Sequence, residues 1–382
     1  MNNVQINGYR SLPLCDIHTH LHKEPLNASL SAFRALMDYY GYAAINLACV
    51  HRMDTDDMDT ANILKGLYLK ARLNEDGETH AIVYGNATHF YDERDTAENY
   101  LAQVKTQYAM GVDGFKILDG KPKNRKHLGH PLCDPVFDKM YAFFEENGIP
   151  VLMHLGDPPH FWGDKSGMSA YGLAHGWWCG DGTFPSLEEL RKEIEGILTK
   201  FPKLKLCLAH FYFLGHDPAG ARAFMEKWEN VSLDLAPGGI MFEGFAAQPD
   251  VWKRFFADFS HRIFFGTDNT NVISGDPAEY FERSWAPVNL VRRMLEWDET
   301  KQVPYSAAKT LTPMHLPREQ LDNIFEKNFR RLHPAARPLD AQLIARYASA
   351  LSKQLQAGNV SDDDPALEIE NLAVIEKYFA AL

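Results

Sequence analysis

The chain has 382 residues, 45% of them hydrophobic, and a formal net charge of −12. This length and apolar content are sufficient for one large globular domain. The acidic charge argues against a general nucleic-acid-binding or membrane-surface role, because both need a basic face; a local basic patch can still serve a small anionic substrate.

In chain order, short apolar runs alternate with longer helical patterns. Several of the apolar runs are almost continuous, as in strands of a parallel sheet that is buried on both faces. The candidate strands are residues 12–18, 43–50, 81–87, 114–118, 150–154, 204–210, 231–235 and 262–266.

Two of the intervening segments carry clear helix signals. Residues 134–147 place apolar side chains at helical spacing and end at Asn147-Gly148, a helix stop. Pro185-Ser186, followed by two glutamates, predicts the start of a helix that runs to about residue 200. Strands that alternate with helices in this way predict a (β/α)8 TIM barrel. The alternative is an open doubly wound sheet, but no Gly-x-Gly-x-x-Gly follows the first strand.

Two connections, residues 154–185 and 268–316, are longer than ordinary turns. Each leaves the C-terminal end of a predicted strand, where barrel active sites are built. Both contain tryptophans, among them Trp162 and Trp285, which argues against disorder, so we interpret both connections as partial lids.

The end of the chain has the pattern of two helices, the second starting at Asp364-Pro365. We therefore predict a barrel domain over residues 1–338 and a C-terminal helical appendage, residues 339–382, packed on it.

The cysteines and the N-terminal residues indicate the cellular compartment of the protein. The five cysteines include no Cys-x-x-Cys pair, so free thiols in a reducing compartment are expected. Residues 1–10 lack an apolar segment long enough for a signal peptide, and no run approaches the roughly 20 apolar residues of a membrane helix. We expect a cytoplasmic protein with a small-molecule substrate and no nucleic-acid or membrane partner. Assembly into a homo-oligomer is compatible with the sequence.

The most informative stretch is Asp16-Ile17-His18-Thr19-His20. Residues i and i+2 of a strand point to one face, so His18 and His20 present two imidazoles side by side, which suits a divalent metal. A lone histidine after a strand is more often a buried structural residue. Here, however, later apolar runs end at His154, His210 and Asp268, so the whole set is expected to converge on one rim of the barrel.

As an ordered set, these motifs resemble the amidohydrolase superfamily, and specifically the amidohydrolase-related branch that also contains non-oxidative decarboxylases. The similarity extends over residues 12–333. It rests on Asp16-Ile17-His18-Thr19-His20, Gly114-Phe115-Lys116-Ile117, Pro150-Val151-Leu152-Met153-His154, Leu208-Ala209-His210, Phe265-Gly266-Thr267-Asp268 and Ile324-Phe325-Glu326-Lys327-Asn328-Phe329.

The resemblance and the residue chemistry together imply a metal centre. His18, His20, His154 and Asp268 would hold one divalent ion, most readily zinc, with manganese or iron as alternatives and a second ion also conceivable. Such an ion would lower the pKa of a bound water, and Asp268 would accept its proton as the general base. By the family pattern, His210 either binds a second metal or polarises the substrate.

Lys116, in the fourth predicted strand, has three interpretations: an ordinary surface group, a substrate anchor, or a carbamylated ligand that bridges two metals. We favour an unmodified anchor for a substrate carboxylate or carbonyl oxygen. The basic run from Lys121 to Lys126 follows it, and this run either attracts anions to the mouth of the barrel or is a solvated loop.

Three functions compete for this site. The first is a metal-dependent hydrolase that acts on a small C–N, lactone or ester-like bond. The second is a lyase, either a non-oxidative decarboxylase or a hydratase, that acts on a small carboxylate with the same metal site. An arginine facing the metal would favour the lyase, and Arg52 and Arg94 are the candidates. The third is a non-enzymatic binding protein, which the complete ligand set disfavours.

Overall fold

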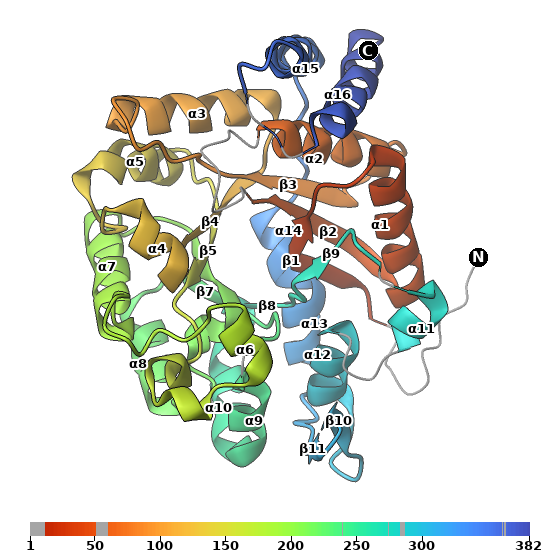
Figure 1. The fold of residues 1–382 in the computed structure, drawn as a ribbon. Coiled ribbons are helices and arrows are strands. Elements are labelled where there is room, and N and C mark those ends of the chain that lie inside the picture. The colour runs from red at the N-terminus through yellow and green to blue at the C-terminus, as the bar shows by residue number, and fades with distance from the viewer. Residues whose placement is uncertain are drawn as a thin grey trace.

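The computed structural model describes residues 12–50, 60–238, 240–273, 275–282, 287–360, 362 and 364–382. Its main sheet is parallel, in the order β8-β7-β6-β5-β4-β3-β2-β1-β9, and helices surround it (Figure 1). Each predicted strand overlaps one of the first eight strands. The strands are β1 Leu14–Leu21, β2 Tyr42–Cys49, β3 Ala81–Gly85, β4 Gly114–Gly120, β5 Val151–Leu155, β6 Leu206–Leu208, β7 Val231–Asp234, β8 Ile263–Phe264 and β9 Asn269–Thr270.

The sheet closes on itself, because β8 and β9 are two pieces of one stretch of chain. Only residues 265–268 separate them, and β9 pairs with β1 through Thr19 opposite Asn269. Across the intervening residues, the Ile17 amide donates to the Phe265 carbonyl over 3.0 Å. The (β/α)8 barrel is therefore confirmed over an open doubly wound sheet.

The helices follow the alternation with the strands. In chain order they are α1 Leu26–Tyr40, α2 Thr60–Leu73, α3 Ala97–Met110, α4 Pro122–Leu128, α5 Asp138–Glu146, α6 Ala170–Ala174, α7 Leu187–Lys200, α8 Pro218–Lys227, α9 Met241–Ala247, α10 Pro249–Phe259, α11 Pro277–Glu282, α12 Pro287–Glu296, α13 Arg318–Asp322, α14 Asn328–Leu332, α15 Ala341–Gln356 and α16 Pro365–Ala380.

The two predicted helix signals hold with small changes. The start of α7 is a capping box between Ser186 and Glu189, and the helix ends at Lys200. The predicted 134–147 helix is split into a short 3-10 turn, Pro135–Phe137, and α5. The long connection after Asp268 contains an unpredicted antiparallel hairpin, β10 Val303–Ser306 and β11 Lys309–Leu311.

The last two helices form the C-terminal helical region. Figure 1 shows α15 and α16 at the top of the view, near α2. A buried ion pair between Lys65 of α2 and Glu368 of α16, 2.9 Å long, fastens this region to the rest of the chain. Asp364 caps α16, as its sequence predicts, by accepting a hydrogen bond from the Leu367 amide. None of the described helices is long and apolar enough to cross a membrane.

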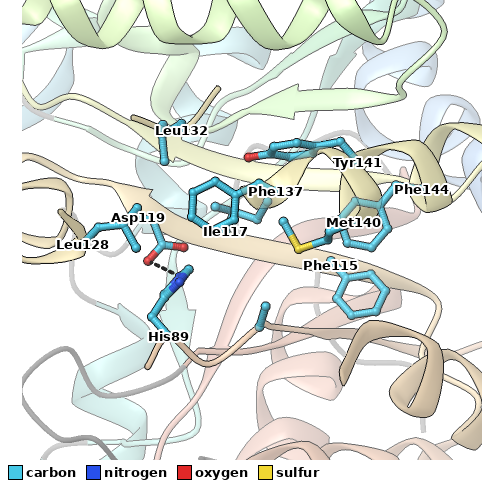
Figure 2. A pocket seen from close by; sticks show the side chains of 11 residues that line it. His89, Phe115, Ile117, Asp119, Leu128, Leu132, Phe137, Met140, Tyr141 and Phe144 are labelled. Carbon is cyan, nitrogen blue, oxygen red and sulfur yellow. Dashed lines mark ion pairs between the residues drawn. The ribbon is translucent and has the colours of Figure 1, made fainter. Parts of the chain in front are cut away.

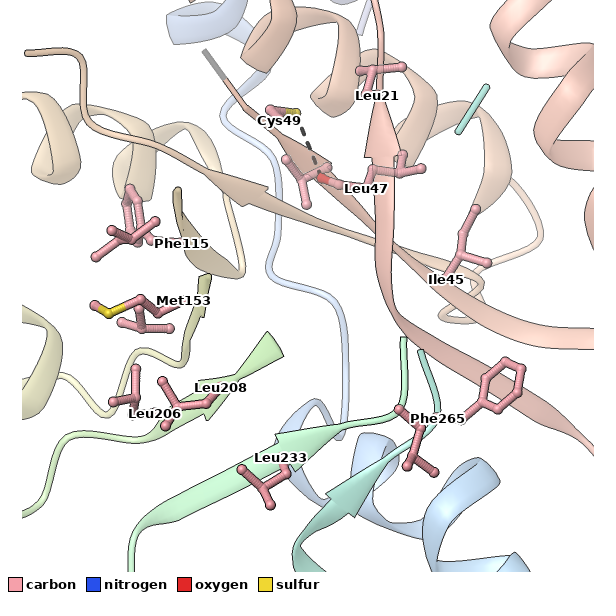
Figure 3. Close-up of a cluster of buried hydrophobic side chains, with 14 of the residues drawn as sticks. Leu21, Ile45, Leu47, Cys49, Phe115, Met153, Leu206, Leu208, Leu233 and Phe265 are labelled. Atoms are coloured by element: carbon pink, nitrogen blue, oxygen red, sulfur yellow. Dashed lines mark hydrogen bonds between the residues drawn. The ribbon is translucent and has the colours of Figure 1, made fainter. Parts of the chain in front are cut away.

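Strand alternation decides which side chains enter the barrel. Phe115, Met153, Leu206, Leu208 and Leu233 belong to the apolar layer between sheet and helices, part of which Figure 3 shows. Their neighbours along the strands point the other way, since successive side chains of a strand alternate between its two faces. A separate, smaller apolar cluster fills the interior, and its buried members are Cys15, Ile17, Ala44, Ala48, Ile82, Tyr84, Leu152, Cys207, Ala209, Phe264 and Phe329.

A bulge in β1 adjusts this alternation at the first motif. Asp16 pairs with Ile45 but Thr19 pairs with Leu47, so three steps in β1 oppose two in β2. Because of the extra residue, both Ile17 and His18 face inward. Ile17 fills the interior while His18 and His20 point to the rim.

Candidate metal centre

Three ligand atoms from the two ends of the barrel sequence converge at the C-terminal rim. His18 Nε2 lies 3.1 Å from His20 Nε2 and 3.3 Å from Asp268 Oδ1. His20 Nε2 lies 2.9 Å from the same carboxylate oxygen. Asp268 leaves 41% of its side chain exposed to solvent. The solvent-accessible space that it faces at this rim is called the hollow below. The bulge in β1 and the closure of the barrel together produce this grouping.

These separations fit a divalent ion. A tetrahedral site with metal–ligand bonds of about 2.0–2.1 Å places its ligand atoms about 3.3 Å apart, close to the distances between His18, His20 and Asp268. Two imidazole nitrogens and a carboxylate oxygen are also a ligand set that zinc commonly takes.

Asp234, at the end of β7, orients His18. Its Oδ2 lies 2.8 Å from His18 Nδ1, and since a carboxylate only accepts, Nδ1 carries the proton and Nε2 keeps its lone pair for a metal. Its Oδ1 accepts from the amides of His210, at 2.8 Å, and Ala236, at 3.0 Å. Both oxygens are thus occupied, so the grouping of His18, His210 and Asp234 is a hydrogen-bond network. Sequence reasoning missed this role, although an acidic residue that ends a buried strand is a usable signal.

Lys116 of β4 points into the same group. It is 1% exposed, and its Nζ donates to His18 Nε2 over 2.8 Å. Burial lowers the pKa of Lys116 to about 8. The interpretation of Lys116 as an ordinary surface group is therefore wrong.

His154 and His210 form a second pair beside the three ligand atoms. His210 Nε2 lies 3.2 Å from His154 Nδ1, and the other nitrogen of each ring faces a carbonyl oxygen, of Gly156 for His154 and of Ala236 for His210. The rings of His18 and His210 are 5.2 Å apart between centroids. The structure thus places His154 next to His210 rather than among the three converging atoms.

Burial keeps these imidazoles in the form that binds metal. It lowers the pKa of His18 and of His154 well below the ordinary value, assisted by Lys116 at His18 and by Lys121 at His154. Burial also lowers the pKa of His210 to about 3, with His154 adding to the effect. Asp268 behaves oppositely: burial raises its pKa, but His18 and His20 outweigh this and hold it well below the usual range. Near neutral pH, His18, His154 and His210 are therefore neutral and the Asp268 carboxylate is ionised.

Backbone strain is concentrated in the same place. Asp268 has a φ of 61°, and residues 210–213 have four successive positive φ values between 50° and 55°. Each such residue costs about 1–3 kcal/mol, and strain of this kind clusters at functional sites. Gly238 accommodates the turn, because a Cβ there would lie 2.4 Å from the His210 Cβ.

The residues of the predicted basic run, Lys121 to Lys126, have different roles in the structure. Some bind neighbouring side chains, whereas Lys121 lies near the candidate metal centre. Arg125 binds the Glu193 carboxylate, and Lys126 donates to the Thr183 hydroxyl over 2.7 Å. Lys121 has no ion-pair partner among the described residues. Its charge adds to the effect of burial at His154, where both lower the pKa. At Asp157 it opposes burial, which raises the pKa of that carboxyl to about 6.

One further histidine–carboxylate pair and the arginine Arg94 lie outside the centre. His89 pairs with Asp119 over 3.0 Å, and Figure 2 shows the pair at one side of a pocket that is otherwise mostly apolar. Arg94 is exposed and bound to Asp92. Arg52, the other arginine considered, and Trp285 lie outside the described residues.

Comparisons with known proteins agree with this geometry. A family model described as amidohydrolase matches residues 15–334. IDCase from Metarhizium anisopliae is 14% identical, with a TM-score of 0.52 over 84% of this chain and 97% of that one. The 4-oxalomesaconate hydratase of Rhodopseudomonas palustris is also 14% identical, with a TM-score of 0.51 over 90% and 99%. At these identities the two structures support the fold alone. No curated protein matches the sequence.

Proposed function

Because the chain belongs to the amidohydrolase family, we propose that it is a hydrolase that uses a metal-activated water to cleave a small anionic substrate at a C–N, lactone or ester-like bond. The observation that carries this proposal is the convergence of His18 Nε2, His20 Nε2 and Asp268 Oδ1 on one point of an open hollow.

The proposal gives each residue a task, and Asp268 has two. His18, His20 and Asp268 would hold a divalent ion, and we assign His154, from the neighbouring pair with His210, as the fourth ligand. When bound, the ion supplies Lewis acidity, which lowers the pKa of a water at the site. Asp268 accepts the proton of that water, since its carboxylate is ionised and open to the hollow. His210 orients the substrate: its Nδ1 donates to the Ala236 carbonyl, which leaves Nε2, beside His154, as an acceptor.

Two lysines support an anionic substrate. Lys116 lies inside the hollow, close enough to the metal ligands to anchor a carboxylate or carbonyl oxygen. Lys121 lies nearer the mouth, where its charge can attract an anion.

We expect about one divalent ion per chain, zinc in preference to manganese or iron, because the structure groups three ligand atoms at one point. Elemental analysis of protein purified without chelator measures the content. His20→Ala should lower it strongly, whereas His127→Ala, on the exposed side of α4, should not. Metal-free protein that takes up no added zinc would contradict the proposal.

Asp234→Asn is expected to weaken metal affinity by about 10–100-fold. The amide oxygen can keep the bonds from the His210 and Ala236 amides, which turns the NH₂ group toward His18 Nδ1. His18 must then carry its proton on Nε2, where it blocks the metal. Competition with a chromophoric chelator measures the affinity, and Asp119→Asn, which alters a similar histidine–carboxylate pair outside the centre, is the control. Equal affinities for wild type and Asp234→Asn would show that Asp234 does not orient His18.

The lyase alternative uses the same ligands. Its distinguishing feature, an arginine facing the metal, is not supplied by Arg94, which is bound to Asp92 on the surface. A panel of small amides, lactones and esters, assayed beside small carboxylates for carbon dioxide release and hydration, separates the two functions.

We also propose a division of the chain at residue 338, with residues 339–382 as an appendage of the barrel. The buried pair between Lys65 and Glu368 supports this arrangement. The five free cysteines support our proposal of a reducing compartment, the cytoplasm.

A further inference from the structure

A cavity of about 240 Å³ lies at the end of the barrel opposite the candidate metal centre. Residues at the beginnings of β5, β6, β7 and β8, together with α14, supply its lining. Lys205 precedes β6 while His210 follows it, and the three strand residues between them, Leu206–Leu208, extend over about 10 Å. The cavity is therefore separate from the hollow that contains His18 and Asp268.

The lining of this cavity is strongly cationic. It contains Lys205, His261, Arg262 and Arg331, and none of the described residues that line it is an aspartate or glutamate. Within the described part of the chain, no carboxylate forms an ion pair with any of these four. The protein as a whole has a net charge of −12, so such an accumulation of positive charge does not follow from composition.

Arg262 has an evident structural task. Its guanidinium donates to the carbonyls of Val231, Met225 and Trp228 over 2.7–2.8 Å, and so holds the C-terminal end of α8. These neutral acceptors fix the guanidinium in place, and Glu229 acts on its charge without forming an ion pair with it.

The other three cations are not explained in this way. Arg331 uses only Nη2, toward the His261 carbonyl and Asn328 Oδ1, which leaves Nε and Nη1 as donors. Lys205 Nζ forms no hydrogen bond within the described residues, and the His261 ring interacts only with the Asp258 backbone there. The pKa of His261 is lowered, first by burial and then by Arg262 and Arg331, which shows the excess of positive charge at this point.

We infer that this cavity binds a phosphate group, either as the free ion or as the end of a small phosphate monoester. Guanidinium and ammonium groups with free donors are the usual partners of phosphate oxygens. Asn230 and Ser232 on the same wall add neutral polar groups. The volume exceeds that of a phosphate with several waters but lies below the roughly 300 Å³ at which drug-sized ligand pockets begin, so a small ligand fits best.

Isothermal titration of the metal-loaded protein with inorganic phosphate, at constant ionic strength in a chloride buffer, tests this inference. Lys205→Met combined with Arg331→Met should raise the Kd by about tenfold or more, because both charge-assisted contacts are lost. Lys203→Met is the matched control, since this exposed lysine lies outside the cavity, and its Kd should equal that of wild type. A parallel titration with glycerol phosphate tells the free ion from a monoester by which of the two binds more tightly.

The metal centre could also attract phosphate, so Lys121→Met is measured as well. Loss of binding in Lys121→Met, together with wild-type affinity in the double variant, would place the anion at the metal centre and overturn the inference. Absence of phosphate binding to the wild type would overturn it too. Circular dichroism checks that the double variant is folded, and the single variant Lys205→Met, altered only at an exposed side chain, gives an independent measurement.

Discussion

Asp268→Asn is expected to lower kcat by about 10²–10⁴-fold, the usual contribution of a positioned general base, while most of the metal stays bound. Asparagine keeps one coordinating oxygen but cannot accept the proton of the attacking water. The backbone should be unaffected, because asparagine tolerates the left-handed conformation of residue 268, where φ is 61°. The Asp268 amide also remains bonded to the His18 carbonyl over 2.7 Å.

Turnover of whichever substrate the panel identifies is measured together with metal content. Asp119→Asn serves as a control, since Asp119 is a buried carboxyl paired with His89, outside the centre, and the mechanism assigns it no proton transfer. Near wild-type turnover in Asp268→Asn would show that another group is the base. Loss of both metal and turnover would indicate that Asp268 acts as a metal ligand and not as the base.

Lys116→Met is expected to raise the KM for an anionic substrate by about 10–100-fold, which corresponds to the loss of one hydrogen bond to a charged group. Methionine has similar length and suits a fully buried position, so the barrel should remain folded. Metal content should stay unchanged, because the proposal uses Lys116 as an anchor for substrate. A neutral analogue of the substrate should bind equally well to both proteins.

The competing role of Lys116 gives different results. Loss of metal in Lys116→Met, or the added mass of carbon dioxide on Lys116 in the wild type, would identify it as a bridging ligand. Such a result would shift the proposal to a binuclear hydrolase.

The barrel could be predicted from sequence because its strands are short, apolar and separated by helical patterns. The metal centre is a harder case. His18, His20 and Asp268 share a rim because His18 and His20 lie in the C-terminal half of β1 and Asp268 follows β8, and such positions can be located from sequence. The position of His154 beside His210 could not be read in this way, because it depends on side-chain directions in neighbouring strands.

Two further features depend on contacts between distant segments. Asp234 contacts His18 across the barrel, and no local pattern connects the two. The basic run looks uniform in sequence, yet Arg125 is used by Glu193 while Lys121 stays near the centre. A helix as short as α4 gives too little periodicity to separate such roles.

The closure of the barrel has a consequence for biosynthesis. His18 and His20 are among the first residues of the barrel to leave the ribosome, whereas Asp268 and its strand partner Asn269 emerge near the end. A nascent chain that lacks its last strand has an exposed edge on β1 and an incomplete set of ligands. Under the proposed ligand assignment, tight metal capture has to wait until the ring is joined, so metal loading during synthesis would report that the barrel is complete. Pulse-labelled, ribosome-stalled chains of increasing length should show this as an abrupt gain in zinc retention once residue 270 has cleared the exit tunnel.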